Sequence, residues 1–193
     1  MLFRSKEYLP YRVIQIDTAE ADDIIGTLCM KFGNELPIGN VDPILIISGD
    51  KDFRQLQKYS NVKQYDPVRK RWLVENNPEA YLKEHIMRGD KGDGVPNFLS
   101  SDDSIVLNTR QKPITQKKVD VWIHQEPTQF CDEQMLRGYK RNEQMVDLTL
   151  VPQNVQDSIM ESYQAQAGKG REKLFNYFIE NKLKNLLTDI GQF

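Results

Sequence analysis

The sequence has little of what secreted and membrane proteins usually carry. Its 193 residues include two cysteines, Cys29 and Cys131, which are too few for a disulfide framework. No apolar run approaches the roughly 20 residues that cross a bilayer, and the N-terminus lacks the apolar centre of a signal peptide. These absences exclude a disulfide-stabilised class and predict a cytoplasmic protein that does not enter a membrane.

Histidine is also scarce. His85 and His124 are the two histidines of the chain, and both lie on helical patterns without a partner motif. We therefore expect them to be packing or surface residues. Any catalytic chemistry would then have to come from other side chains.

Carboxylates, in contrast, gather in three short motifs where helix or strand patterns break. The motifs are EADD, SGDKDF and GDKGDG, and their acids are Glu20, Asp22, Asp23, Asp50, Asp52, Asp90 and Asp93. Each motif alone has a structural explanation, because acids favour helix starts and aspartates favour turns. Their joint appearance favours a site for hard divalent cations, which need several oxygen ligands from separate segments.

The net charge of −2 hides two basic stretches. One runs from Lys58 to Arg71 and the other from Ser104 to Lys118, which contains no acid. Such stretches are compatible with phosphate binding and equally with a solvated positive face.

Hydrophobic patterns predict an α/β fold. We expect a strand at 12–16, a helix at 20–32 and a β-branched strand at 44–47 that is buried on both faces. Parallel strands in such a unit would bring the acids that follow them to one edge of the sheet. In the DxD pair, a period of two would place both aspartates on one side and turn Lys51 away.

The rest of the chain alternates short strands with helices and then becomes mostly helical. The expected strands are 62–65 and 72–74, and the expected helices are 51–57, 79–87, 115–123, 133–148, 154–166 and 172–187. The last helix is rich in aromatic and aliphatic residues. It is expected to pack as core, or alternatively to dock a replication partner such as a single-strand binding protein or clamp.

The order EADD, LIISGDKDFRQL, GDKGDGVPN resembles the 5′ to 3′ exonuclease and flap endonuclease family, and most closely its T-even-phage ribonuclease H type. The resemblance implies a partial PIN-like nuclease domain with a parallel sheet over residues 1–93. It also implies a mostly helical DNA-binding region with a helix-turn-helix element over residues 94–193. The implied activity is Mg²⁺-dependent hydrolysis of phosphodiesters in RNA primers and adjacent DNA.

Roles follow from the resemblance residue by residue. Glu20, Asp22, Asp50 and Asp52 resemble catalytic ligands of two Mg²⁺ ions, which Mn²⁺ could replace, and Asp93 and Asp90 resemble the outer ligand set. Asp23 matches the motif without an expected ligand role. The implied partners are forked or flapped duplex DNA and RNA–DNA hybrid, and the candidate nucleic-acid contacts are Gly94, Val95, Arg110, Lys112, Lys117 and Lys118.

The sequence departs from the family pattern in two places. It corresponds to a start about halfway through the nuclease domain, so we expect a truncated or split nuclease that exposes the apolar face of Ile44 to Ile47. That nuclease would need a separate N-terminal fragment. The second departure is a long polar loop, Asn97 to Lys112, inserted between the two gripping helices.

Two other interpretations stay open. One is a noncatalytic DNA-binding remnant that keeps the helix-turn-helix grip. The other is a topoisomerase-primase-type metal domain, although the third acid cluster and its GVPN turn argue against it.

Overall fold

The structure is a computed structural model that describes residues 6–33 and 42–192. Contacts divide the chain into two compact units. The larger unit, Ala21–Val151, contains a β-sheet and several helices. The smaller unit joins Met1–Glu20 to Pro152–Phe193, and its described regular structure is helical. The predicted α/β class is therefore confirmed, while the predicted functional division at residue 93 stays a prediction.

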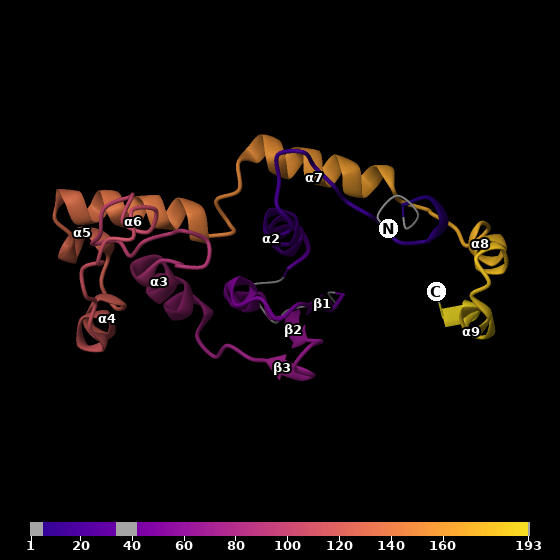
Figure 1. Cartoon of the computed structure of the whole chain (residues 1–193), viewed down its shortest axis with the longest axis horizontal. Coiled ribbons are helices and arrows are strands. Elements are labelled where there is room, and N and C mark those ends of the chain that lie inside the picture. The colour runs from indigo at the N-terminus through magenta and orange to yellow at the C-terminus, as the bar shows by residue number, and fades with distance from the viewer. Residues whose placement is uncertain (1–5, 34–41, 193) are drawn as a thin grey trace. The chain divides into compact units, whose positions relative to one another are not determined.

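The larger unit contains a three-stranded sheet in the order β1-β2-β3 (Figure 1). The strands are β1 (Ile44–Ile47), β2 (Val62–Asp66) and β3 (Arg71–Leu73), close to their predicted bounds. β1 runs parallel to β2, and β3 runs antiparallel to β2, so the sheet is mixed. The 3-10 helix η1 (Asp52–Lys58) lies in the connection from β1 to β2.

β1 is paired on one side only within the described residues. Ile46 is buried, but Leu45 is 50% and Ile47 is 65% exposed. The prediction of a strand buried on both faces is therefore wrong, because no described element covers the face that carries these two side chains. The expected exposed apolar face is confirmed.

The predicted strand at 12–16 is also wrong, since the segment has no regular structure. Its backbone is satisfied by a side chain in place of a neighbouring strand. The amide of Gln166 accepts from Val13 N at 2.9 Å and donates to Val13 O at 3.1 Å. The Glu20 and Asp22 motif consequently follows an irregular segment and opens helix α2 (Ala21–Phe32).

One core of the larger unit lies between α2, η1 and the sheet. Its buried residues are Cys29, Ile46, Phe53, Leu56, Tyr59, Val62 and Leu148. Gln55 of η1 anchors this core to a distant part of the chain, because its side chain donates to Val146 O at 2.9 Å and accepts from Leu148 N at 3.0 Å. η1 is thereby held in place directly after the acidic Asp50–Asp52 segment.

A second core joins the helices that follow the sheet. These are α3 (Pro78–Arg88), α4 (Gln116–Trp122), α5 (Pro127–Phe130) and α6 (Glu133–Val146). α3, α4 and α6 match predicted helices. Phe98 lies in the middle, with its ring 5.6 Å from that of Trp122 and 6.1 Å from that of Tyr139, both edge-on. The predicted loop from Asn97 to Lys112 thus contributes its first residues to the core.

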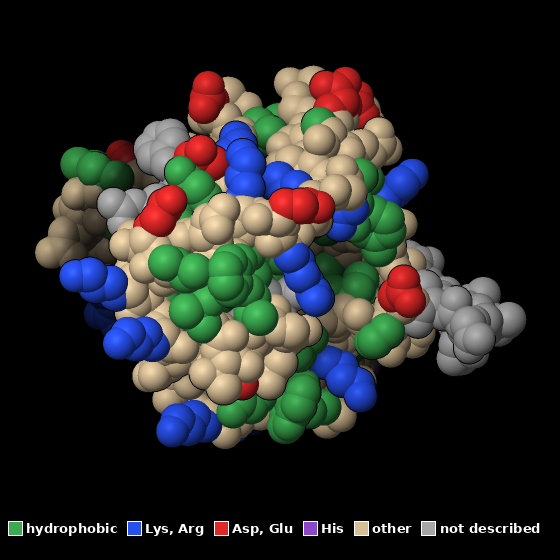
Figure 2. Space-filling model, turned by 90° about the vertical axis from the view of Figure 1, so that its right-hand side faces the viewer, with side chains coloured by type: hydrophobic (Ala, Val, Ile, Leu, Met, Phe, Trp, Pro, Cys, Tyr) green, Lys and Arg blue, Asp and Glu red, His purple; other side chains and the backbone are tan. Residues whose placement is uncertain are grey.

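The smaller unit contains α7 (Gln153–Ala165), α8 (Leu174–Glu180), α9 (Lys184–Thr188) and the 3-10 helix η2 (Ile190–Gln192). The single helix predicted at 172–187 is broken, because Lys182 takes a φ of 56°. Leu174 and Phe178 are buried as expected, whereas Phe175 and Ile179 are about half exposed, at 53% and 50%. On the side of the molecule shown in Figure 2, hydrophobic side chains form surface patches among basic and acidic ones.

None of the helices in 6–33 and 42–192 has the length and apolar character that crossing a bilayer requires.

Candidate metal centre and nucleic-acid interface

Two of the three acidic motifs meet in the larger unit. SGDKDF follows the carboxyl end of β1 and opens η1, while GDKGDG follows α3. η1 packs against α3, and this packing brings Asp52 of η1 beside the last turn of α3. There His85 lies between Asp52 and Asp90, the first aspartate of the GDKGDG motif.

The local conformation after α3 turns Asp90 back toward His85. α3 ends at Gly89, whose φ is 67° and whose amide donates to His85 O at 2.8 Å. A side chain at Gly89 would lie 2.5 Å from the carbonyl oxygen of Pro96, so glycine is needed here for space as well as for conformation. Asp90 then pairs with Val95 in an antiparallel bridge that closes the turn.

The resulting cluster has ligand atoms of Asp52, His85 and Asp90 within 4.8 Å of one another. His85 Nδ1 lies 3.4 Å from Asp52 Oδ1, and His85 Nε2 lies 3.3 Å from Asp90 Oδ2. The side chains of His85 and Asp90 are 8% and 4% exposed. Asp52 Oδ1 and His85 Nδ1 are both buried without a hydrogen-bond partner. Orphaned buried acceptors are costly, and a bound cation would satisfy them, so the residues fit a metal ion.

The two aspartates of the cluster have pKa values that are shifted in opposite directions. Burial, together with the nearby carboxylates of Asp50 and Asp90, raises the pKa of Asp52 to about 6. Burial acts on Asp90 in the same direction, but hydrogen bonds from Lys51 and from the Gly92 amide outweigh it and hold the pKa of Asp90 below its usual value. Burial lowers the pKa of His85, against the opposing effect of Asp90.

Lys51 does not point away from the aspartates, as its place in the DxD pair had suggested. Its Nζ atom lies 2.5 Å from Asp90 Oδ2. The reason is the backbone of this segment: Lys51 has φ −73° and ψ −24°, which is helical, so the period of two that holds for a strand does not apply. The hydrogen bond to Asp90 raises the pKa of Lys51.

His85 is the member of the cluster that the motifs did not indicate: it was expected to be a packing or surface residue, and the structure places it between Asp52 and Asp90. Its only sequence signal is weak: it lies in the last turn of a helix and five positions before Asp90. The other histidine, His124, is exposed, as predicted.

The other predicted metal ligands lie outside this group. Asp22 is in the first turn of α2, and Asp50 and Asp93 are exposed. Among the described residues, three potential ligand side chains lie close enough to hold one ion in a single place only, and they are Asp52, His85 and Asp90. Metal ligation by Glu20, Asp22, Asp50 and Asp93 stays a prediction.

The predicted nucleic-acid contacts lie on the turn after α3 and on the segment that leads into α4. Gly94 is exposed with a φ of 76°, whereas Val95 is buried and its amide donates to Asp90 O at 2.7 Å. The side chains of the four basic candidates are exposed, and two of them open α4; they are Arg110, Lys112, Lys117 and Lys118. Their contacts with nucleic acid stay predictions.

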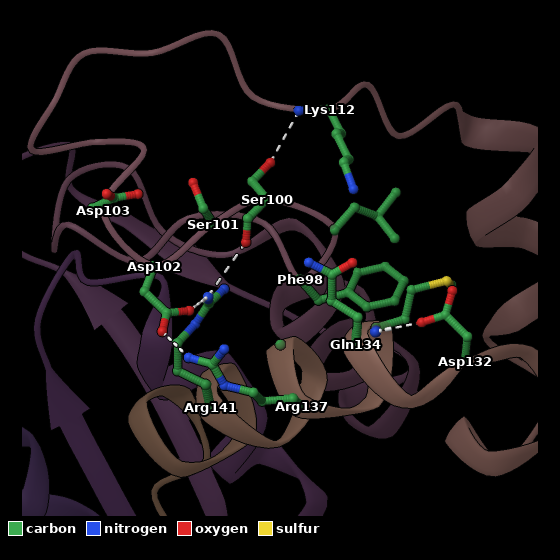
Figure 3. Close-up of a pocket in the computed structure, with 13 residues that line it drawn as sticks. Phe98, Ser100, Ser101, Asp102, Asp103, Lys112, Asp132, Gln134, Arg137 and Arg141 are labelled. Atoms are coloured by element: carbon green, nitrogen blue, oxygen red, sulfur yellow. Dashed lines mark hydrogen bonds and ion pairs between the residues drawn. The ribbon is translucent and has the colours of Figure 1, made fainter.

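A pocket of about 440 Å³ lies between the loop from Asn97 to Lys112 and α6 (Figure 3). Residues 98–103 and Lys112 line one side, and Arg137 and Arg141 on α6 both reach the carboxylate of Asp102. Arg141 also donates to Pro96 O at 3.1 Å and to Asn97 O at 3.3 Å. The arginine thus fixes the start of the long loop.

Comparison with known proteins supplies the family. Residues 76–193 match the family model described as T4 RNase H, C terminal. The chain therefore belongs to this family of phage nuclease proteins, as the motifs predicted.

Two individual proteins are similar to it. The chain is 32% identical to ribonuclease H of Enterobacteria phage T4 over 195 residues, which cover 97% of this chain and 62% of the T4 protein. It thus spans less than two thirds of the length of that relative. The crystal structure of the T5 D15 protein co-crystallized with metal ions is similar with a TM-score of 0.47 and 18% identity, over 79% of this chain and 62% of D15.

Proposed function

We propose that the chain is part of a Mg²⁺-dependent 5′ to 3′ exonuclease or flap endonuclease of the ribonuclease H type. Its substrates would be the phosphodiesters of RNA primers and of adjacent DNA. The observation that carries the proposal is the meeting of Asp52 and Asp90 at one buried point, in a chain that belongs to the T4 RNase H family.

The chemistry assigned to the site is hydrolysis without a side-chain nucleophile. Bound Mg²⁺ ions supply activation of a water and neutralisation of the charge that develops on the phosphate, and Mn²⁺ can replace them. Asp52 at the start of η1 and Asp90 after the end of α3 would hold the metal. The further proposed ligands are Glu20, Asp22, Asp50 and Asp93. The ammonium of Lys51, now on Asp90 Oδ2, would be released when Asp90 binds a metal ion.

The proposed DNA-binding part begins after Asp93. In this proposal residues 1–93 are the partial PIN-like nuclease domain. Its last helix, α3, forms a spread helix-turn-helix grip together with α4 of the DNA-binding part, with the long loop between them. Gly94 contacts phosphate through its exposed backbone. Arg110, Lys112, Lys117 and Lys118 bind further phosphates of a forked or flapped duplex or an RNA–DNA hybrid, independently of sequence.

Two protein partners belong to the same proposal. Exposed Phe175 and Ile179 on α8 offer a docking point for a single-strand binding protein or clamp. A separate N-terminal nuclease fragment is the second proposed partner.

A second candidate is a noncatalytic DNA-binding protein. The specific observation in its favour is the ion pair between Lys51 and Asp90, which neutralises one of the proposed metal ligands at 2.5 Å. Such a protein would keep the exposed cations at the start of α4 and bind forked duplexes without cutting them.

The test is cleavage of an end-labelled 5′-flap duplex and an RNA-primed template by the purified chain with Mg²⁺. The double variant Asp50→Ala/Asp52→Ala is compared in the same assay. Cleavage that the double variant loses supports the nuclease. Duplex retention in a gel shift, without cleavage and without change in the double variant, supports the binding protein and overturns catalysis by this chain alone.

A further inference from the structure

His85 has an unusual position for a buried histidine, because each of its ring nitrogens faces a carboxylate oxygen. Nδ1 is 3.4 Å from Asp52 Oδ1 and Nε2 is 3.3 Å from Asp90 Oδ2. A neutral imidazole carries one N–H, so it can donate to one of these oxygens and not to both. In one of the two contacts, therefore, a ring nitrogen and a carboxylate oxygen face each other as two hydrogen-bond acceptors.

The unpaired contact is on the side of Asp52. Both Nδ1 and Asp52 Oδ1 are buried without a hydrogen-bond partner, whereas Nε2 is within hydrogen-bond distance of Asp90. With Nε2–H donating to Asp90, the lone pair of Nδ1 points toward Asp52 Oδ1. Two buried lone pairs that face each other are costly, and a cation bound between them would satisfy both.

The arrangement of Nδ1, Nε2 and a carboxylate is also the one that metal-binding histidines usually have. One ring nitrogen binds the ion, and the other donates to a carboxylate that fixes the ring and its tautomer. Here the exposed fraction of the His85 side chain is 8%, so the ring has little freedom to turn away.

We propose that Nδ1 of His85 and Oδ1 of Asp52 form a mixed nitrogen and oxygen site for a first-row transition-metal ion of the Zn²⁺ type, with Asp90 accepting from Nε2–H and fixing the ring. Imidazole nitrogen suits Zn²⁺ and related ions, whereas Mg²⁺ prefers oxygen ligands and keeps much of its water. His85 therefore shifts the metal preference of the site away from Mg²⁺. The inference deepens the proposed function, since Asp52 and Asp90 belong to the proposed metal centre, but its test does not depend on cleavage.

The decisive measurement is NMR of the metal-depleted full chain with ¹⁵N in its histidine rings. The chain has two histidines, so His124 is an internal control in every spectrum. A Cys131→Ser background removes the more accessible thiol, because thiolates also bind zinc. On addition of one equivalent of Zn²⁺, the Nδ1 signal of His85 should move to a metal-bound position, while Nε2 stays protonated and His124 is unchanged.

Affinities measured by calorimetry complete the test. His85→Gln should lower the affinity for Zn²⁺ by about 10- to 100-fold and the affinity for Mg²⁺ by less than about threefold. His124→Gln is the matched control and should change neither. The proposal is overturned by a His85 signal that does not move at saturating Zn²⁺, or by an equal loss of both affinities in His85→Gln.

The outcomes also separate this inference from the nuclease proposal. If His85→Gln does not fold, the NMR titration of the wild-type chain still decides the question. Zinc ligation without any cleavage of flap substrate supports the metal site and counts against the nuclease. Cleavage with Mg²⁺ and an unmoved His85 signal supports the nuclease and overturns the nitrogen ligand.

Discussion

The Nζ atom of Lys51 lies 2.5 Å from Oδ2 of Asp90. The ammonium group of this lysine therefore already pairs with a carboxylate oxygen of the candidate metal centre. Lys51 is 51% exposed and its ammonium can leave to solvent at small cost, whereas Asp90 is 4% exposed and cannot. The pair therefore competes with a metal ion for Asp90.

Replacing Lys51 by methionine should strengthen metal binding. Exposed ion pairs contribute up to about 1 kcal/mol, which corresponds to an affinity gain of roughly fivefold at most for Mg²⁺ or Zn²⁺. Calorimetry on the metal-depleted chain measures it. Lys63→Met removes the same charge at an exposed position of β2 and should have no effect. Unchanged or weaker binding by Lys51→Met would show that Lys51 does not compete.

Asp52 should make the stability of the metal-free chain depend on pH. Its pKa is about 6 in the folded chain against 3.8 for the free side chain, so the folded state binds the proton more tightly. Its stabilising contribution is then complete below pH 4 and is lost as the pH rises through 6. Asp52→Asn should be equally stable near pH 4 and more stable above pH 7, by on the order of 2 kcal/mol. Urea unfolding in the presence of a chelator measures the difference, and parallel pH curves would contradict it.

Gly138 should tolerate no side chain. A Cβ atom there would overlap the carbonyl oxygen of Phe98, a backbone atom that cannot move without disturbing the second core. Gly138→Ala should therefore destabilise the chain by about 2 kcal/mol or more in urea unfolding. Gly191→Ala, where a Cβ meets nothing within 4 Å, is the control and should change stability by less than about 0.5 kcal/mol. Equal stability of both variants would argue against the packing of α6 on the segment that contains Phe98.

The two arginines of the loop pocket should differ in importance. Arg141 is 18% exposed and donates to the carbonyls of Pro96, Asn97 and Ser100 as well as to Asp102. Arg137 is 74% exposed and pairs with Asp102. Arg141→Gln should cost about 2 kcal/mol and speed hydrogen exchange at residues 96–104, whereas Arg137→Gln should cost less than about 1 kcal/mol. Similar exchange in both variants would show that Asp102 alone holds the loop.

Lys117 and Lys118 should account for part of the salt dependence of duplex binding. Both are exposed in the first turn of α4, where no acidic residue lies. Lys117→Gln/Lys118→Gln should weaken binding to a forked duplex and reduce the slope of log affinity against log salt by about 1 to 2. Lys31→Gln, at an exposed position of α2, should leave the slope unchanged. A slope that is the same in all three proteins would place the DNA elsewhere.

The sequence alone determined the family, the acidic motifs and most helices and strands. Local chemistry explains this success, as at the start of α3. There Asn77 accepts from Ala80 N at 3.1 Å and Pro78 occupies the first turn, and both signals lie within a few residues. The strands β2 and β3 likewise follow from short apolar patterns around a basic turn.

Only the tertiary structure decided which side chains meet. Lys51 reaches Asp90, and Asp52 reaches His85, because η1 packs against α3, a contact between separate segments that no local pattern reports. Packing also overrode local preference at Val13, whose backbone pairs with the side chain of Gln166 and forms no strand. The motif sequences supplied the carboxylates, and the fold decided that a histidine and a lysine lie among them.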